Sequence, residues 1–174
     1  RLAHLLEHEK SIPGAIVEQG DARNMQSIKN NSIDAIVTSP PYLNAIDYLR
    51  GHRMSLIWFG YRVSELRKIR SESVGASRAP DPQMDLKIAH KLIESCYGID
   101  ELPASKRAMI LRYSYDVDAF LREAGRVLRP WGTAVYVVGN SCMNGLFIDN
   151  TSIVIKAAHQ YGLRLVDRYE RELL

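Results

Sequence analysis

The alternation of apolar and polar residues divides the chain into two kinds of segment. Short apolar runs bounded by turn residues predict strands, and apolar positions that recur every three or four residues predict helices. Strands are expected at residues 15–23, 32–39, 133–138 and 163–170. Helices are expected at residues 2–6, 44–61, 63–70, 84–97, 115–128 and 150–161. Asp149 or Asn150 can cap the last of these helices, and Gly162 stands where a C-terminal glycine is expected. The two kinds of element alternate, which predicts an α/β fold with a parallel sheet and helices on both of its faces.

The strand expected at residues 32–39 ends at two prolines. Pro40 and Pro41 cannot continue a central sheet ladder because they have no N–H group. Ser39 and Pro40 each precede a proline, so both are restricted to extended backbone angles. The segment therefore presents carbonyl groups, a serine hydroxyl and the Tyr42 ring in nearly fixed directions. This arrangement suits a flat group that carries N–H donors.

Residues 38–42 read Thr-Ser-Pro-Pro-Tyr. This sequence resembles the catalytic motif of amino-methylating DNA methyltransferases, which transfer a methyl group from S-adenosylmethionine (AdoMet) to an exocyclic amine. The serine form is similar to that of cytosine-N4 enzymes, whereas adenine-N6 enzymes more often carry Asp or Asn there. The resemblance implies site-specific DNA methylation of the restriction-modification kind. The alternative is a proline-rich ligand segment, although such segments do not usually follow a buried strand.

The resemblance implies catalytic roles for Ser39, Pro40, Pro41 and Tyr42. A cytosine amino group is a poor nucleophile because its lone pair is delocalised into the ring. We hypothesise that the Ser39 hydroxyl and the Pro40 carbonyl accept its two N–H groups while the Tyr42 ring stacks on the base. No covalent intermediate is needed, but the base must be flipped out of the duplex.

Gly20, Asp21 and Ala22 follow the first predicted strand. The resemblance implies that the Asp21 carboxylate accepts the adenine amino group of AdoMet and that the Ala22 N–H binds a ring nitrogen. Thr38, at the end of the next strand, is assigned to the same cofactor site. The alternative is that Asp21 caps a helix over residues 23–29, a common role for Asp. The two roles do not exclude each other.

Residues 126–132 read Arg-Val-Leu-Arg-Pro-Trp-Gly and precede an apolar strand. They resemble the Arg-Val-Leu-Lys-Pro-Gly-Gly pattern of Rossmann-like (class I) methyltransferases, which implies that the chain holds a partial sheet of that fold. Ligands of such sheets bind beyond the carboxyl ends of the strands. We therefore expect Asp21, the motif at residues 39–42 and Asn140 to converge, with Asn140 contacting the substrate.

Four polar residues on the helix expected after the motif are substrate-binding candidates: Asn44, Tyr48, His52 and Arg53. Tyr48, His52 and Arg53 fall within about one helical turn of one another. They are expected to line the pocket of the extruded base or to contact phosphates. Any one of them taken alone is better explained as a packing or surface residue.

Positive charge is concentrated between residues 50 and 78. This segment holds seven Arg and Lys residues against two Glu, a local charge of +5 in a chain whose net charge is +3. Such a distribution favours a polyanion-binding face, with double-stranded DNA as the expected partner and RNA as the alternative. Residues 61–110 have an irregular pattern and are interpreted as an insertion that reads DNA. A charged, solvated lid is the alternative interpretation.

The composition indicates one globular domain over residues 1–174, with 46% hydrophobic and 25% charged residues. No apolar run approaches a membrane span and no signal peptide is present, so a cytoplasmic, nucleoid-associated prokaryotic protein is expected. Cys96 and Cys142 suggest neither a disulfide framework nor a zinc site. His4 and His8 lie one helical turn apart, where a solvated helix face is the favoured interpretation, and no metal is expected.

One feature of the resembled family is missing. The sequence lacks the glycine-rich turn, of the Asp-x-Phe-x-Gly-x-Gly type, that wraps the methionine part of AdoMet, and it begins at Arg1. We therefore expect a partial methyltransferase domain whose remainder lies beyond one or both ends. The alternatives are an adenine-N6 DNA methyltransferase, an RNA amino-methyltransferase acting on tRNA or rRNA, and a non-catalytic nucleic-acid-binding fragment.

Overall fold

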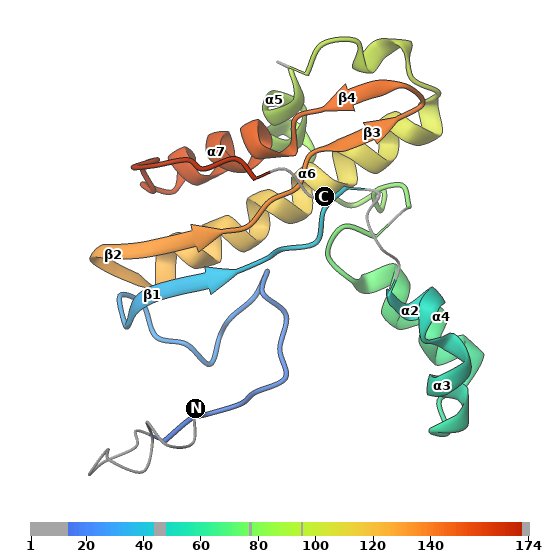
Figure 1. The fold of residues 1–174 in the computed structure, drawn as a ribbon, viewed down its shortest axis with the longest axis horizontal. Coiled ribbons are helices and arrows are strands. Elements are labelled where there is room, and N and C mark those ends of the chain that lie inside the picture. Colours follow the sequence, from blue (N-terminus) through green and yellow to red (C-terminus); the bar gives the residue numbers. More distant parts are fainter. Residues whose placement is uncertain (1–13, 44–47, 77, 95, 172–174) are drawn as a thin grey trace.

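The computed structural model describes residues 14–43, 48–76, 78–94 and 96–171. It is a mixed helix and strand fold with a small parallel sheet (Figure 1). The elements, in order, are β1 (Ile33–Thr38), α2 (Tyr48–Gly51), α3 (Arg53–Trp58), α4 (Val63–Glu72), α5 (Lys87–Ile93), the 3-10 helix η1 (Ile99–Glu101), α6 (Ala104–Val127), β2 (Leu128–Tyr136), β3 (Ser141–Met143), β4 (Leu146–Ile148) and α7 (Asn150–Gln160). The helix expected at residues 2–6 lies outside the described residues.

Strands β1 and β2 form the parallel sheet, with Thr38 opposite Tyr136 at its carboxyl end. Strand β2 begins directly after α6, so the long helix runs back along the sheet that it connects (Figure 1). The Tyr136 ring packs against Phe120 of α6, with ring centroids 6.1 Å apart. The predicted parallel pairing of the two apolar strands is therefore confirmed.

The opposite face of this sheet is exposed in the described part of the chain. Val37 and Val135, which are paired across the two strands, are 78% and 48% exposed. Side chains alternate between the faces of a strand, so these valines point away from the face that carries Tyr136. Helices were expected on both faces of the sheet. Among the described residues only one face is covered, by α6, and the prediction for the other face is wrong.

The apolar core lies between helices α5, α6 and α7 and the antiparallel β3–β4 hairpin. Ile110, Leu121, Ile148, Ile153 and Ala157 are fully buried there. Helix α6 supplies much of this core because its apolar residues recur at helical spacing on one side. The hairpin was not predicted, because its three-residue strands are too short to give a periodic signal.

The ends of α7 follow their sequence signals. The Asp149 side chain accepts a hydrogen bond from the Ser152 N–H at 3.0 Å, which makes Asp149 the N-cap residue. Gly162 follows the helix with a φ of +78°, a left-handed conformation that favours glycine. Both predicted caps are confirmed.

The strands expected at residues 15–23 and 163–170 do not form. Residues 14–20 and 163–170 have no strand pairing, and Ile16, Val17 and Val166 are 87%, 94% and 87% exposed. A strand is stable only when its backbone groups pair with a neighbouring strand, and local apolar alternation cannot supply that neighbour. These two predictions are wrong for the structure as described.

Several helix boundaries also differ from the prediction. The helix expected at residues 44–61 is interrupted at His52, between α2 and α3, and its first four residues lie outside the described chain. Helix α4 confirms the one expected at residues 63–70, and α5 is shorter than expected. Helix α6 begins at Ala104, inside the segment interpreted as an irregular insertion. Residues 23–29 form turns rather than a helix.

Arg126, the first arginine of the Arg-Val-Leu-Arg-Pro sequence, binds the segment that leads into β1. The Arg126 guanidinium donates to the carbonyl oxygens of Met25 and Ile28 and to Asn30 Oδ1, at 2.7 to 2.9 Å. Glu123 receives the Met25 N–H at 2.8 Å and also binds Arg126. The end of α6 therefore sets where β1 starts.

Among the described residues, no helix has the length and hydropathy to span a membrane.

Candidate active site at the end of strand β1

The five residues after β1 form a sharp elbow. Thr38 ends the strand, and its carbonyl accepts the Val137 N–H at 3.0 Å. The Ser39 hydroxyl lies 3.2 Å from the Tyr42 hydroxyl and donates to the Val137 carbonyl at 3.4 Å. Ser39 is exposed and Tyr42 is half-buried, so their polar atoms meet at the surface. Two of the predicted catalytic side chains are therefore brought together.

The elbow is anchored by apolar contacts. Pro40 is buried and Leu43 is 2% exposed. One face of the Tyr42 ring lies against Gly139, where an added Cβ atom would be 2.9 Å from two ring carbons. The backbone after β2 therefore has to be glycine for the ring to occupy this position, and Pro41 remains exposed on the outer side.

A chain of hydrogen bonds that the sequence did not reveal joins the elbow to α7. The buried Asn150 side chain donates to the Gly139 carbonyl at 2.9 Å and to Ser141 Oγ at 2.7 Å. Ser141 Oγ in turn donates to the Leu43 carbonyl. The sequence predicts for Asn150 only the role of a helix cap. In the structure Asn150 is buried and links two segments, and the burial of a residue cannot be predicted from its identity alone.

Asn140 lies beyond β2, as predicted, but its side-chain oxygen is already bound. Asn140 Oδ1 accepts from the Thr151 N–H at 3.2 Å and from the Thr151 hydroxyl at 3.1 Å. Its oxygen thereby satisfies a backbone N–H in the first turn of α7. A role in substrate binding would have to use the amide nitrogen of this exposed residue.

The predicted cofactor acid, Asp21, does not follow a strand. It sits in a turn, where its Oδ1 accepts the Arg23 N–H at 2.9 Å. The Arg23 guanidinium binds both carboxylate oxygens, at 2.8 to 3.2 Å. This pairing lowers the pKa of Asp21 below its usual value. Asp21 therefore closes a turn on Arg23 instead of capping a helix, and Ala22 is an exposed residue of that turn.

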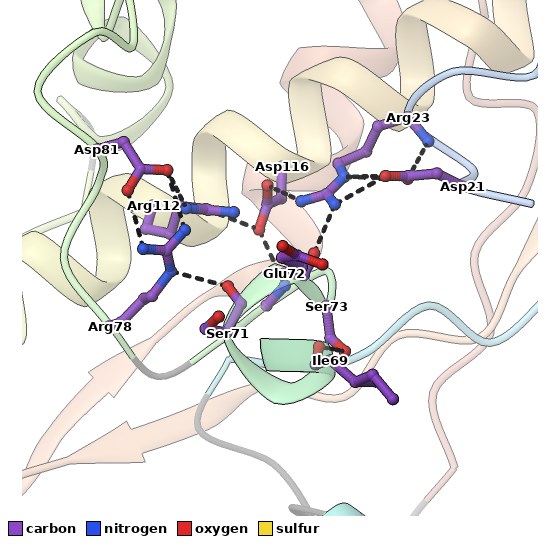
Figure 2. A network of polar contacts seen from close by, with 11 residues as sticks. Asp21, Arg23, Ile69, Ser71, Glu72, Ser73, Arg78, Asp81, Arg112 and Asp116 are labelled. Atoms are coloured by element: carbon purple, nitrogen blue, oxygen red, sulfur yellow. Dashed lines mark hydrogen bonds and ion pairs between the residues drawn. The ribbon is translucent and has the colours of Figure 1, made fainter. Parts of the chain in front are cut away.

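Arg23 connects this turn to a buried carboxylate on α6 (Figure 2). Asp116, fully buried, accepts from Arg23 Nη1 at 2.8 Å, from the Gly75 N–H at 3.0 Å and from Arg112 Nε at 3.2 Å. We call these four residues the Asp116 clamp. Because a buried carboxylate is costly unless it is paired, the two arginines and the backbone N–H are what make this position tolerable.

The Asp116 clamp is extended on the Arg112 side. Arg112 Nη1 lies 3.5 Å from an Asp81 oxygen, and Asp81 is bound by both terminal nitrogens of Arg78 (Figure 2). Arg78 also donates to the Ser71 carbonyl at 2.7 Å. Arg78, counted in the sequence with the DNA-binding charges, is therefore committed to an internal ion pair.

The Asp116 clamp holds the turn at Gly75, and this turn lies next to the elbow. Gly75 has a φ of +72°, and its Cα faces the elbow: an added Cβ would lie 3.4 Å from Pro41 Cβ and 3.7 Å from the Tyr113 ring. Tyr113 is 1% exposed, and burial, with a smaller contribution from nearby Tyr42, raises its pKa above the usual value. The turn that Asp116 holds therefore lies next to the Pro-Pro-Tyr segment of the elbow.

The comparisons with known proteins point to methyltransferases. The chain is 22% identical over 171 residues to the type II methyltransferase M.MvaI of Kocuria varians, an alignment that covers 91% of this chain and 37% of that enzyme. It is 27% identical over 62 residues to the type II methyltransferase M.BsoBI of Geobacillus stearothermophilus, covering 36% of this chain and 12% of that enzyme. The chain is thus distantly similar to two type II methyltransferases.

The chain spans well under half the length of these two relatives. No protein-family model matches the chain. No solved structure matches it either.

The described residues do not provide the cofactor contact that the resemblance implies. Both carboxylate oxygens of Asp21 are bound by Arg23, so they are not positioned to receive the amino group of an adenine. Thr38 contributes backbone pairing to the sheet, and its side chain is exposed. Asp21 therefore does not fit the AdoMet role in this structure.

The remaining candidates lie on the segment after the elbow. Asn44 is outside the described residues. Tyr48 is the first residue of α2, His52 lies between α2 and α3, and Arg53 begins α3. His52 and Arg53 are exposed. Within the described part of the chain, no group of three His, Cys, Asp or Glu residues is arranged to hold a metal ion.

Proposed function

We propose that the chain supplies the target-base site of an AdoMet-dependent DNA amino-methyltransferase that acts on cytosine N4, built on a Rossmann-like sheet. The observation that carries this proposal is the elbow after β1, where the Ser39 hydroxyl lies 3.2 Å from the Tyr42 hydroxyl next to the Val137 carbonyl. The distant similarity to two type II methyltransferases supports the reaction class.

The elbow offers acceptors without competing donors from its own backbone. Pro40 and Pro41 carry no N–H group, and the proposal assigns the Pro40 carbonyl and the Ser39 hydroxyl to hold the two N–H groups of an amine. Held in this way, the nitrogen becomes more tetrahedral and its lone pair is directed outward. AdoMet, when bound, supplies the methyl group.

The Tyr42 ring is proposed to stack on the flipped base. One of its faces is covered by Gly139, which fixes the orientation of the ring. A stacked aromatic pair contributes about 0.5–1.5 kcal/mol beyond area burial, which offsets part of the cost of extracting the base. The exposed cations of the segment from α3 to α4 would hold the phosphates of double-stranded DNA. We expect this activity in the cytoplasm of a prokaryote, at its nucleoid.

The test is nucleoside mass spectrometry of DNA from cells that express the full-length protein containing this chain. We expect N4-methylcytosine with the wild-type protein and a loss of about 100-fold or more with Ser39→Ala or Tyr42→Ala, because both remove groups that orient the amine. Ser105→Ala, which removes an exposed hydroxyl in the first turn of α6, is the matched control and should methylate normally.

Each other outcome overturns a specific part of the proposal. N6-methyladenine in place of N4-methylcytosine would show that the base is wrong. Methyl groups in tRNA or rRNA and not in DNA would show that the substrate is RNA. If the purified full-length protein binds DNA but transfers no tritiated methyl group from AdoMet, the chain is a nucleic-acid-binding module and the transferase proposal is wrong.

A further inference from the structure

The carboxyl end of helix α4 is bound by the Asp116 clamp. Arg23 Nη2 donates to the Glu72 carbonyl at 2.6 Å, and Nη1 of the same guanidinium donates to Asp116 at 2.8 Å (Figure 2). Arg78 donates in the same way to the Ser71 carbonyl at 2.7 Å. Glu72 is the last residue of α4, and the last four carbonyls of a helix have no partner within it. Arg23 therefore joins the end of α4 to a buried carboxylate on α6.

The chain that follows α4 returns at once to the same carboxylate. The Ala76 N–H bonds to the Ser73 carbonyl at 3.1 Å, which closes a turn over residues 73–76. Gly75 lies in this turn and donates its N–H to Asp116 Oδ2 at 3.0 Å, while Arg23 binds Oδ1 of the same side chain. The two oxygens of one carboxylate thus hold the chain before and after the end of α4.

Gly75 is also the residue of this turn that lies next to the elbow. A Cβ atom added to Gly75 would be 3.4 Å from Pro41 Cβ and 3.9 Å from the Tyr42 carbonyl oxygen. Protein interiors are close-packed, so a shift of Gly75 toward these atoms would displace the elbow. The position of the elbow therefore depends on the turn that Asp116 holds.

The direction of α4 depends on its carboxyl end, because the rest of the helix packs little. Helix α4 extends away from α6 and the sheet (Figure 1). Leu66 is the one residue of α4 that is buried, whereas Arg67 and Lys68 are exposed. Exposed cations on a helix can contact the phosphates of a nucleic acid. A phosphate contact on α4 therefore acts on the Asp116 clamp through the end of the helix.

We propose that Asp116 is a positioning residue that couples α4 to the elbow, so that DNA bound to the cations of α4 fixes the place of the Pro41-Tyr42 segment. This inference rests on the proposed function and adds the residue through which binding acts on the base site. Binding energy from a remote contact can be used to position a reacting group. The link consists of charge-assisted hydrogen bonds to a buried carboxylate, which are strong and directional.

The test uses the full-length protein that contains this chain. Asp116→Asn is expected to destabilise the fold, so Arg23→Met is the variant of choice. It frees the Glu72 carbonyl, while Asp116 keeps Arg112 and the Gly75 N–H. We expect kcat for transfer of tritiated methyl groups to unmethylated plasmid DNA to fall about tenfold, a usual size for coupling between two sites. The Kd for the same DNA, measured by fluorescence anisotropy, should change less than about twofold, because no cation of α4 is altered.

Arg129→Met is the matched control. Arg129 is also an arginine paired with an acid, Asp34, but the two lie where β1 and β2 begin, at the end of the sheet away from the elbow. Both kcat and Kd should equal the wild-type values. Wild-type kcat in Arg23→Met overturns the proposal. So does an equal loss of kcat and of DNA affinity, because Arg23 would then support DNA binding or the fold as a whole.

Hydrogen exchange followed by mass spectrometry reads the coupling without catalysis. Saturating DNA should slow exchange of the Tyr42 and Leu43 N–H groups in the wild-type protein and leave it unchanged in Arg23→Met. Equal slowing in both proteins, or none in the wild type, overturns the proposal. Slowing that depends on Arg23 in a protein that methylates no nucleoside would keep the coupling and refute the transferase. Methylation with wild-type kcat in Arg23→Met would keep the transferase and refute the coupling.

Discussion

Gly139 lies against the ring of Tyr42 so closely that a Cβ atom added to Gly139 would be 2.9 Å from the Cδ2 and Cε2 atoms of that ring. This contact joins the end of β2 to the motif that follows β1, two segments whose pairing is set by the parallel sheet. The position of the candidate stacking ring therefore depends on a residue without a side chain, about a hundred residues away in the sequence.

Gly139→Ala should displace the Tyr42 ring and lower methyl transfer by about 100-fold, the cost of misplacing a reacting group by about 1 Å. Gly51→Ala is the control, since nothing lies within 4 Å of the added Cβ at this helical glycine. Initial rates with tritiated AdoMet measure the effect. Equal rates for the two variants would mean that Tyr42 has no defined role.

Asp116→Asn should destabilise the fold by about 3 kcal/mol, because it removes the buried carboxylate that pairs with both arginines and leaves them only the more exposed Asp21 and Asp81. Urea unfolding followed by circular dichroism measures the change. Asp100→Asn, at an exposed acid of η1, should unfold like the wild-type chain. A loss below about 1 kcal/mol would show that the Asp116 clamp contributes no more than an exposed ion pair.

Tyr136→Phe should stabilise the chain by about 1 kcal/mol at neutral pH, because the buried Tyr136 hydroxyl has no hydrogen-bond partner among the described residues. Burial also raises the pKa of Tyr136 to about 12. The unfolded chain loses this proton near pH 10 while the folded chain retains it, so stability falls as the pH rises from 10 to 12.

Thermal unfolding between pH 7 and 12 tests this prediction. The Tyr136→Phe chain should lose less stability above pH 10 than the wild type, and Tyr97→Phe, at an exposed ring, should follow the wild type. Parallel curves for all three chains would contradict the assigned burial.

Trp131→Gly should stabilise the fold by about 0.5–1 kcal/mol. Trp131 has a φ of +69°, a left-handed conformation that is costly for any side chain, and it is 98% exposed, so little packing is lost. The related Pro-Gly-Gly pattern carries glycine at this place. Trp131→Ala retains the strain and should show no gain; a gain of the same size in both variants would refute the explanation by φ.

The sequence predicted local structure correctly where that structure depends only on residues within the same segment. The Pro40-Pro41 elbow, the Asp149 cap, the left-handed Gly162 and the helical stripe of α6 depend on backbone sterics or on contacts within a few residues, and they form as predicted. The apolar runs at residues 15–23 and 163–170 read equally well as strands, but pairing is decided by a partner strand and not by the run itself.

The sequence alone determined the stiff elbow after the strand, because proline fixes φ and removes the N–H wherever it occurs, but the strand itself was expected to be buried and has no buried residue in the structure. Only the tertiary structure decided what surrounds that elbow. Gly139 under the Tyr42 ring, the Gly75 turn held by Asp116, and Asn150 linked through Ser141 to Leu43 are contacts between segments distant in sequence. Arg23 shows both cases, because its contact with Asp21 is local, two residues apart, whereas its contact with the buried Asp116 joins segments far apart in the sequence and exists only once the chain is folded.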